Sequence, residues 1–153
     1  MTGFPNLFSP ITVGSRTFRN RIFSTGHMTC LLNDDLVPDE RFVAYHESRA
    51  RGGAGLIIME AARIHETGGH RNLDVSSDDA IPGLRRVGEA VQKHCCAIFG
   101  QLGHSGAYGV TTGDGSLGVS YAPSQAKSSR SHNISRELPL SLIHEYVAAY
   151  GSA

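Results

Sequence analysis

The fold class depends most on one stretch, GGAGLIIMEAA at positions 52–62. Its centre, residues 55–59, is a short apolar run without alternating polar side chains, which is typical of a strand covered on both faces, as in a parallel sheet. Residues 97–102, AIFGQL, repeat this pattern, and residues 21–24, RIFS, form a shorter one before it. The sequence therefore predicts strands of a mainly parallel sheet at these three places.

Helical patterns separate the predicted strands. A helix is expected from about residue 40 to residue 51, with Asp39 as its N-cap and two glycines, 52 and 53, at its end. A second helix is expected to begin near Asp79 with Pro82 in its first turn, and a third to run from Leu140 to Tyr150. The apolar stripe of the second helix consists of Ile81, Leu84, Val87 and Val91. Strands that alternate with helices predict βα units.

The flanking segments complete the expected topology. A hairpin around Gly14 is expected at residues 11–18, and residues 103–139 have little periodicity, which predicts a long loop. A closed barrel of βα units takes about 250 residues. We therefore predict an α/β fold with about three βα units plus an N-terminal hairpin, the N-terminal portion of a (β/α)8 TIM barrel. In this interpretation residues 1–153 form one partial domain, truncated at the C-terminus; a complete small three-layer domain is the alternative.

Composition excludes several classes of protein. Fourteen Lys and Arg balance fourteen Asp and Glu, so there is no basic excess for binding nucleic acid. No apolar run reaches the roughly 18 residues of a membrane span, and the first residues do not resemble a signal peptide. Three cysteines without a pairing pattern indicate reduced thiols and a cytoplasmic location. His65 and His70 are spaced five apart rather than four, so no metal site is predicted.

Small and hydrogen-bonding residues follow the predicted strands. In a parallel barrel the carboxyl ends of the strands form the face that carries the site. Gln101 is explained equally well as a polar residue satisfied inside the barrel. A histidine such as His104, on a glycine-rich loop, is more often a surface residue than a catalytic one. The residues at the three strand ends are Thr25, Gly26, His27 and Met28, then Glu60 and Ala61, then Gln101 with His104 beyond it.

Several segments, taken in order, resemble the old yellow enzyme family of NADH:flavin oxidoreductases. The resemblance covers nearly the whole chain and is closest to the branch with 2,4-dienoyl-CoA reductase, trimethylamine dehydrogenase and N-demethylases. The matching segments are LFSPI at 7–11, NRI at 20–22, YHESRARGGAGLII at 45–58, MEAA at 59–62, QLGHSG at 101–106, YAPS at 121–124 and REL at 136–138.

The resemblance implies a cofactor and a reaction. Family members bind FMN at the C-terminal mouth of the barrel, and the matching positions that would contact its ring are Thr25, Gly26, His27, Met28, Ala61 and Gln101. A primary amide such as that of Gln101 both donates and accepts hydrogen bonds, as the polar edge of the ring requires. His27 would either touch the substrate or pack beside the ring. NADH or NADPH would reduce the flavin, which would then reduce an activated alkene, or the enzyme would demethylate an amine oxidatively.

The sequence departs from the family pattern at two positions and leaves part of the expected site unassigned. Ala107 stands where many members have Arg, and Thr25 where many have Pro or Ala. The fourth-strand pair that holds the substrate, the phosphate site and any iron–sulfur cluster would lie beyond residue 153. The catalytic residues are therefore unknown, with His104 kept as a candidate, and the chain alone is expected to be inactive. The expected partner is a small-molecule substrate, and self-association of the full-length protein is left open.

Two other functions remain open at this stage. One is a non-catalytic half-barrel that binds a ligand or pairs with another chain, because unpaired sheet edges invite association. The other is a barrel enzyme without flavin, because a fold does not determine a function.

Overall fold

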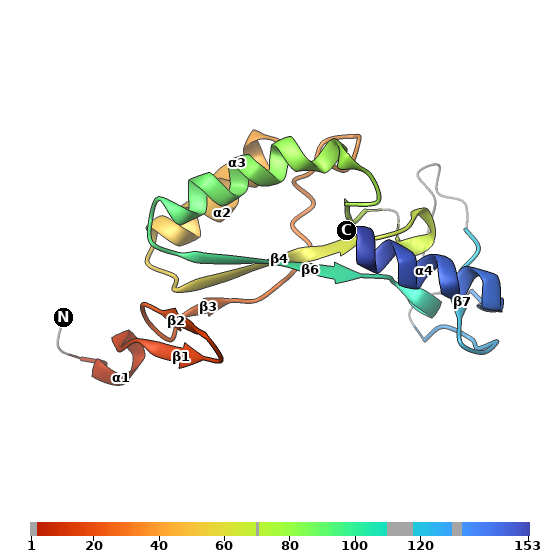
Figure 1. Ribbon diagram of the computed structural model, residues 1–153, viewed down its shortest axis with the longest axis horizontal. Coiled ribbons are helices and arrows are strands. Elements are labelled where there is room, and N and C mark those ends of the chain that lie inside the picture. The colour runs from red at the N-terminus through yellow and green to blue at the C-terminus, as the bar shows by residue number, and fades with distance from the viewer. Residues whose placement is uncertain (1–2, 70, 110–117, 130–132) are drawn as a thin grey trace. The chain divides into compact units, whose positions relative to one another are not determined.

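A computed structural model describes residues 3–69, 71–109, 118–129 and 133–153. Contacts divide the chain into two compact units, the first made of Met1–Glu60 and Ala80–Gln101 and the second of Ala61–Asp79 and Leu102–Ala153. Two strands, β4 (Leu56–Arg63) and β6 (Ala97–Gly103), begin in the first unit and end in the second (Figure 1). The mixture of parallel strands and helices is the predicted α/β class.

Strands of the first unit follow the predicted order. After the short helix α1 (Pro5–Phe8), β1 (Ile11–Val13) and β2 (Arg16–Phe18) form the expected antiparallel hairpin, with Gly14 at φ +58° in its turn. Next, β3 (Phe23–Ser24) pairs in parallel with the start of β4, Phe23 opposite Leu56. The strand β6 also pairs with β4. The parallel arrangement expected from the apolar runs is thus confirmed for β3 and β4.

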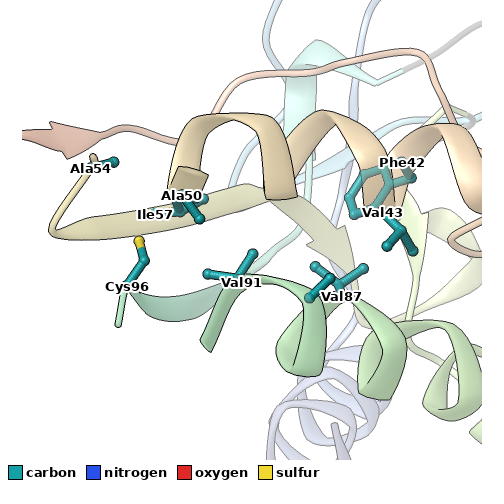
Figure 2. Close-up of a cluster of buried hydrophobic side chains, with 9 residues drawn as sticks. Phe42, Val43, Ala50, Ala54, Ile57, Val87, Val91 and Cys96 are labelled. Carbon is teal, nitrogen blue, oxygen red and sulfur yellow. The ribbon is translucent and has the colours of Figure 1, made fainter. Parts of the chain in front are cut away.

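Two helices cover the start of β4. Asp39 caps α2 (Glu40–Arg51) as predicted, since its Oδ1 accepts hydrogen bonds from the backbone N–H of Arg41 at 2.9 Å and of Phe42 at 3.1 Å. The short 3₁₀ turn η2 (Asp78–Ala80) leads into α3 (Ile81–Gln92), which packs beside α2 (Figure 1). Their shared core, drawn in Figure 2, contains Phe42, Val43, Ala50, Ala54, Ile57, Val87, Ala90, Val91 and Cys96.

The apolar stripe predicted for α3 is only partly buried. Val87 and Val91 are fully buried, whereas Ile81 is 47% exposed. At about 100° per residue, Ile81 lies about 120° round the helix from Val87, so it turns away from the core that Val87 faces. The inclusion of Ile81 in the stripe was therefore wrong.

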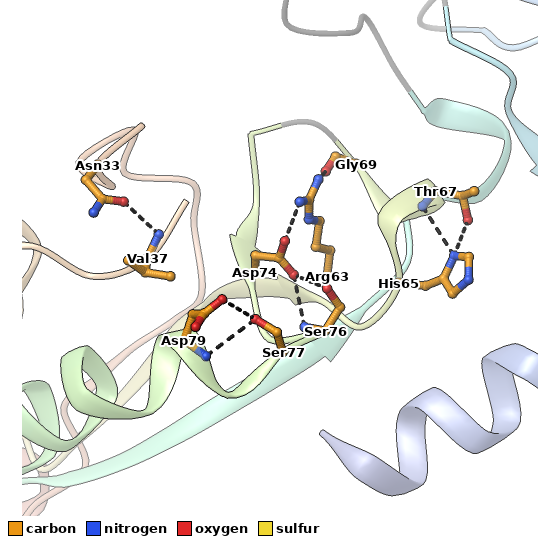
Figure 3. A network of polar contacts seen from close by, with 10 residues as sticks. All are labelled: Asn33, Val37, Arg63, His65, Thr67, Gly69, Asp74, Ser76, Ser77 and Asp79. Carbon is orange, nitrogen blue, oxygen red and sulfur yellow. Dashed lines mark hydrogen bonds and ion pairs between the residues drawn. The ribbon is translucent and has the colours of Figure 1, made fainter. Parts of the chain in front are cut away.

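The second unit contains the end of β4. There β5 (Leu73–Asp74) pairs in parallel with β4, Ala62 opposite Leu73. The guanidinium of Arg63 binds the carboxylate of Asp74 and the carbonyl oxygen of Gly69, the latter at 3.1 Å (Figure 3). Burial raises the pKa of Asp74, but its bonds to Arg63 and Ser76 outweigh burial and hold that pKa below its usual value. The remaining elements are η1 (Glu66–Gly68), η3 (Gly106–Tyr108), β7 (Tyr121–Ala122), β8 (Arg136–Glu137) and α4 (Leu140–Ser152).

Two predictions need correction here. The segment 103–139 contains regular structure, because β7 and β8 pair in parallel and η3 precedes them; residues 110–117 and 130–132 lie outside the described residues. The second strand also runs beyond residue 59, since its pairing with β5 extends it to Arg63. Glu60 and Ala61 therefore lie within β4 rather than after it. In the described part of the chain, no helix is both long and apolar enough to span a membrane.

Candidate functional site

The backbone of Gly26, just beyond β3, lies against two other strands of the first unit. A Cβ added to Gly26 would stand 2.4 Å from Oε1 of Gln101 on β6 and 2.8 Å from the carbonyl oxygen of Met59 on β4. Neither distance is compatible with a side chain, so the close approach of Gly26 to β4 and β6 requires glycine at this position. The structure thus brings Gly26 and Gln101, both predicted site residues, into direct contact.

The amide of Gln101 is available for a ligand. Gln101 lies in an exposed part of β6, and none of the described residues forms a hydrogen bond with its side chain. An exposed amide offers both a donor and an acceptor to a planar polar group.

Thr25, Gly26, His27 and Met28 form one exposed segment that is anchored at its far end. Oε2 of Glu60 accepts hydrogen bonds from the backbone N–H of Thr29 at 2.7 Å and from its hydroxyl at 2.5 Å. Glu60 is only 2% exposed, and its Oε1 has no hydrogen-bond partner among the described residues. A buried carboxylate that holds Thr29 fixes the position of the segment before it.

His27 contacts a residue that the sequence analysis did not single out. Its Nδ1 lies 3.1 Å from the carbonyl oxygen of Thr25, and its Nε2 forms a hydrogen bond with the hydroxyl of Tyr45 on α2. The guanidinium carbon of Arg49, one turn further along α2, lies 3.4 Å from the centre of the Tyr45 ring. Spacing of i and i+4 on one helix explains this stacking.

His46 is the buried histidine of this unit. It is 2% exposed and packs edge-on against the rings of Phe42 and Tyr45, and neither ring nitrogen has a partner among the described residues. Burial lowers its pKa to about 4, and the charges of Arg49 and His27 act in the same direction. His46 is therefore uncharged at neutral pH.

The remaining predicted residues, Ala61 and His104, belong to the second unit. Ala61 is half-buried on β4, directly after Glu60, and a Cβ placed on Gly103 would lie 3.5 Å from the Cβ of Ala61. Ala61 is therefore linked to the predicted site residues of the first unit only by its place in the sequence, directly after Glu60.

His104 takes part in a hydrogen-bonded cluster centred on Thr67. Its Nδ1 accepts a hydrogen bond from the backbone N–H of Gly106 at 3.0 Å, so the ring proton lies on Nε2. That Nε2–H donates to the hydroxyl oxygen of Thr67, also at 3.0 Å. That oxygen accepts a second bond from the hydroxyl of Tyr146 at 2.6 Å, and the Thr67 hydroxyl donates to Nδ1 of His65 at 2.9 Å. Burial and the neighbouring His65 lower the pKa of His104. Both ring nitrogens are thus engaged, which favours a positioning role for this histidine.

Sequence reasoning missed Tyr45 and Thr29, and it noted Glu60 without an anchoring role. The position of Glu60 at the end of an apolar run could have indicated its anchoring role, because a buried carboxylate needs hydrogen-bond partners. Tyr45 gave no such signal. The described residues contain no cluster of three or more His, Cys, Asp or Glu side chains placed to hold a metal ion, and His70 lies outside them.

Comparison with known proteins gives the family. Residues 6–153 match the model of the NADH:flavin oxidoreductase / NADH oxidase family. The NADH oxidase of Thermoanaerobacter brockii is 34% identical over the whole chain, which spans 24% of that enzyme.

Solved structures agree with this match. The old yellow enzyme homologue from Zymomonas mobilis superposes on 97% of the chain with a TM-score of 0.81 and 27% identity. Morphinone reductase in complex with tetrahydroNAD superposes on 95% of it with a TM-score of 0.83 and 28% identity. The chain spans 44% of each of these proteins. Its fold is that of about three βα units of a (β/α)8 barrel, and it belongs to the NADH:flavin oxidoreductase / NADH oxidase family, which includes the old yellow enzymes.

Proposed function

We propose that the chain contributes to an FMN-dependent oxidoreductase that uses NADH or NADPH, and that Thr25, Gly26, His27, Met28, Ala61 and Gln101 face the flavin ring. The observation that carries this proposal is the contact between Gly26 and Gln101. At this contact the backbone of Gly26, which has no side chain, lies next to the exposed amide of Gln101.

These features fit a flavin in shape and in hydrogen bonding. Because Gly26 has no Cβ, the Gln101 amide lies close to the backbone of Gly26, and a flat ring beside that amide would lie against the exposed segment 25–28. The pyrimidine edge of a flavin carries carbonyl oxygens and an N–H, and one primary amide matches both kinds of group. Glu60 supports the arrangement through Thr29, because it holds the end of the exposed segment.

The bound flavin would supply hydride transfer between the nicotinamide and the substrate, which is either an activated alkene or an amine that loses a methyl group. The chain's own residues would orient that ring: Gln101 through its amide, and the segment 25–28 through its backbone. The substrate itself is a small molecule held in part by residues outside this chain.

Titration of the purified chain, and of a longer protein that contains it, with FMN tests the proposal. We expect quenching of FMN fluorescence on binding, and loss of the visible absorbance of the bound flavin when NADH or NADPH is added without oxygen. Binding without reduction would favour the non-catalytic binding module. Failure of both proteins to bind FMN would contradict the flavin site.

A further inference from the structure

We propose that Thr29 is a positioning residue of the candidate flavin site. Its hydroxyl and its backbone N–H both bind Glu60, and these bonds hold the exposed segment 25–28 in the shape that receives the ring. The inference rests on the proposed function, because it concerns the same site. It assigns a role to the Thr29 hydroxyl and to the strained residue that follows it, Cys30.

Two anchored ends flank the segment 25–28. On one side Ser24, the last residue of β3, pairs with Ile57 of β4. On the other side Leu31 packs against the core that α2, α3 and β4 share. All four residues of the segment are exposed. Their position therefore depends on the few contacts made between these two ends.

The hydroxyl of Thr29 forms hydrogen bonds in two directions. It donates to Oε2 of Glu60 at 2.5 Å, and its oxygen accepts a hydrogen bond from the backbone N–H of Leu31 at 3.3 Å. The backbone N–H of Thr29 donates to the same Oε2 at 2.7 Å. Glu60 is 2% exposed and lies within β4, so it is an acceptor with a fixed position that water does not reach. Thr29 is thus bound both to the sheet and, across Cys30, to Leu31.

The backbone of Cys30 is strained. Its φ of +56° lies in the left-handed region, which is unfavourable for a residue that carries a Cβ. The side chain of Cys30 is exposed, so burial does not offset this strain. The bond between the Leu31 N–H and the Thr29 oxygen spans Cys30 and fixes the backbone on both sides of it. The Thr29 hydroxyl therefore holds a strained turn next to the candidate site, where strain often serves function.

A segment that is fixed before the ligand arrives favours binding, because the free protein has already lost the freedom that binding would remove. Without the Thr29 hydroxyl, the strain at Cys30 would relax and the segment 25–28 would adopt other shapes. The expected result is a lower FMN affinity, although every residue assigned to contact the ring is still present.

Hydrogen exchange of the chain without flavin tests the positioning role. Thr29→Val keeps the shape of the side chain but removes its hydroxyl, so the amides of residues 29 and 31 should exchange about tenfold faster relative to their intrinsic rates. Thr29→Ser, which keeps a hydroxyl, should exchange like the wild type. The amide of Val91, a buried residue of α3, should be unchanged in both variants if the core is intact. Equal exchange in the valine and serine variants would overturn the proposal.

FMN titration of the same variants, in the chain and in a longer protein that contains it, tests the link to the cofactor. Thr29→Val should weaken FMN binding about tenfold, whereas Thr29→Ser should bind FMN like the wild type. Unchanged affinity in the valine variant would show that Thr29 does not position the site. If the wild-type proteins bind no FMN, the proposed function fails, and the exchange experiment still decides whether Thr29 holds the segment.

Cys30→Gly tests the role of strain. Glycine adopts a positive φ without a Cβ penalty, so adding this substitution to Thr29→Val should improve FMN affinity about threefold over the single valine variant. Cys30→Ser removes the thiol but keeps the Cβ, and as the matched control it should give no recovery. Recovery with both substitutions, or with neither, would contradict strain at Cys30 as the cause of the displaced segment.

Discussion

The side-chain amide of Gln101 lies directly on the backbone of Gly26: a Cβ on Gly26 would stand 2.4 Å from the amide oxygen. The two residues are far apart in the sequence, and they meet because β3 and β6 both pair with β4. This contact leads to two predictions about the proposed flavin site.

Gly26→Ala should weaken FMN binding at least tenfold. The new methyl group would displace the Gln101 amide and would also meet the carbonyl oxygen of Met59 at 2.8 Å, which cannot move as a side chain does. We expect the overpacking to lower the free energy of unfolding by about 1–3 kcal/mol. FMN titration and urea denaturation measure the two effects.

Gly88→Ala is the matched control, because nothing lies within 4 Å of a Cβ at that helical position. It should leave FMN binding unchanged and stabilise α3 by about 1 kcal/mol. Equal FMN affinity in the Gly26 and Gly88 variants would contradict a flavin ring at Gly26.

Gln101→Ala should reduce FMN affinity with little effect on folding. The amide is exposed, so its loss leaves no buried group in the free protein, whereas the bound ring would lose partners at a cost of about 1–3 kcal/mol. Fluorescence titration checks this loss, and Gln92→Ala, at an exposed position of α3, is the control. Unchanged flavin content in the Gln101 variant would favour a barrel enzyme without flavin.

His46 should make stability depend on pH between about 6.5 and 4. In the unfolded chain its pKa is the ordinary value near 6.5, and burial lowers it to about 4 in the folded chain. The unfolded state therefore binds the proton first as pH falls. The stabilising contribution is complete above pH 6.5 and is lost as the pH falls to about 4, a change of about 3 kcal/mol.

Urea denaturation at several pH values measures this dependence. His46→Leu should flatten the curve between pH 4 and 6.5, whereas His144→Leu, at an exposed position of α4, should preserve it. Asp39 and Asp74 have lowered pKa values in the folded chain, so their ionised carboxylates stabilise it. That contribution is lost at a lower pH than the contribution of His46. An unchanged slope in the His46 variant would refute the assignment.

Tyr146→Phe should destabilise the second unit by about 0.5–1.5 kcal/mol, since it removes the bond from the tyrosine hydroxyl to Thr67. Burial raises the pKa of Tyr146 despite that bond, which is consistent with a hydroxyl that keeps its proton. Hydrogen exchange at the amide of Gly106, which donates to His104, reports on the same cluster. Tyr150→Phe, which removes a hydroxyl from a 45% exposed ring on α4, is the control, and equal exchange rates in both variants would exclude a structural role for the Thr67 cluster.

Much of the fold could be predicted from local signals. The helix α2 has its N-cap at Asp39 and its glycines at the end, and the hairpin has Gly14 in its turn, so each is determined within a few residues. The length of β4 could not be predicted in this way, because its last residues are extended by pairing with β5. The same holds for β7 and β8, whose two-residue strands carry no periodicity.

The same distinction between local signals and contacts of distant segments applies to the candidate site. The sequence by itself determined that small and polar residues stand at the ends of three apolar runs, and its resemblance to a flavin family identified Gly26 and Gln101. Only the tertiary structure decided that Gln101 lies on Gly26, that Glu60 holds Thr29, and that Tyr45 meets His27. Strand and helix patterns depend on neighbouring residues, whereas these contacts depend on how distant segments pair and pack.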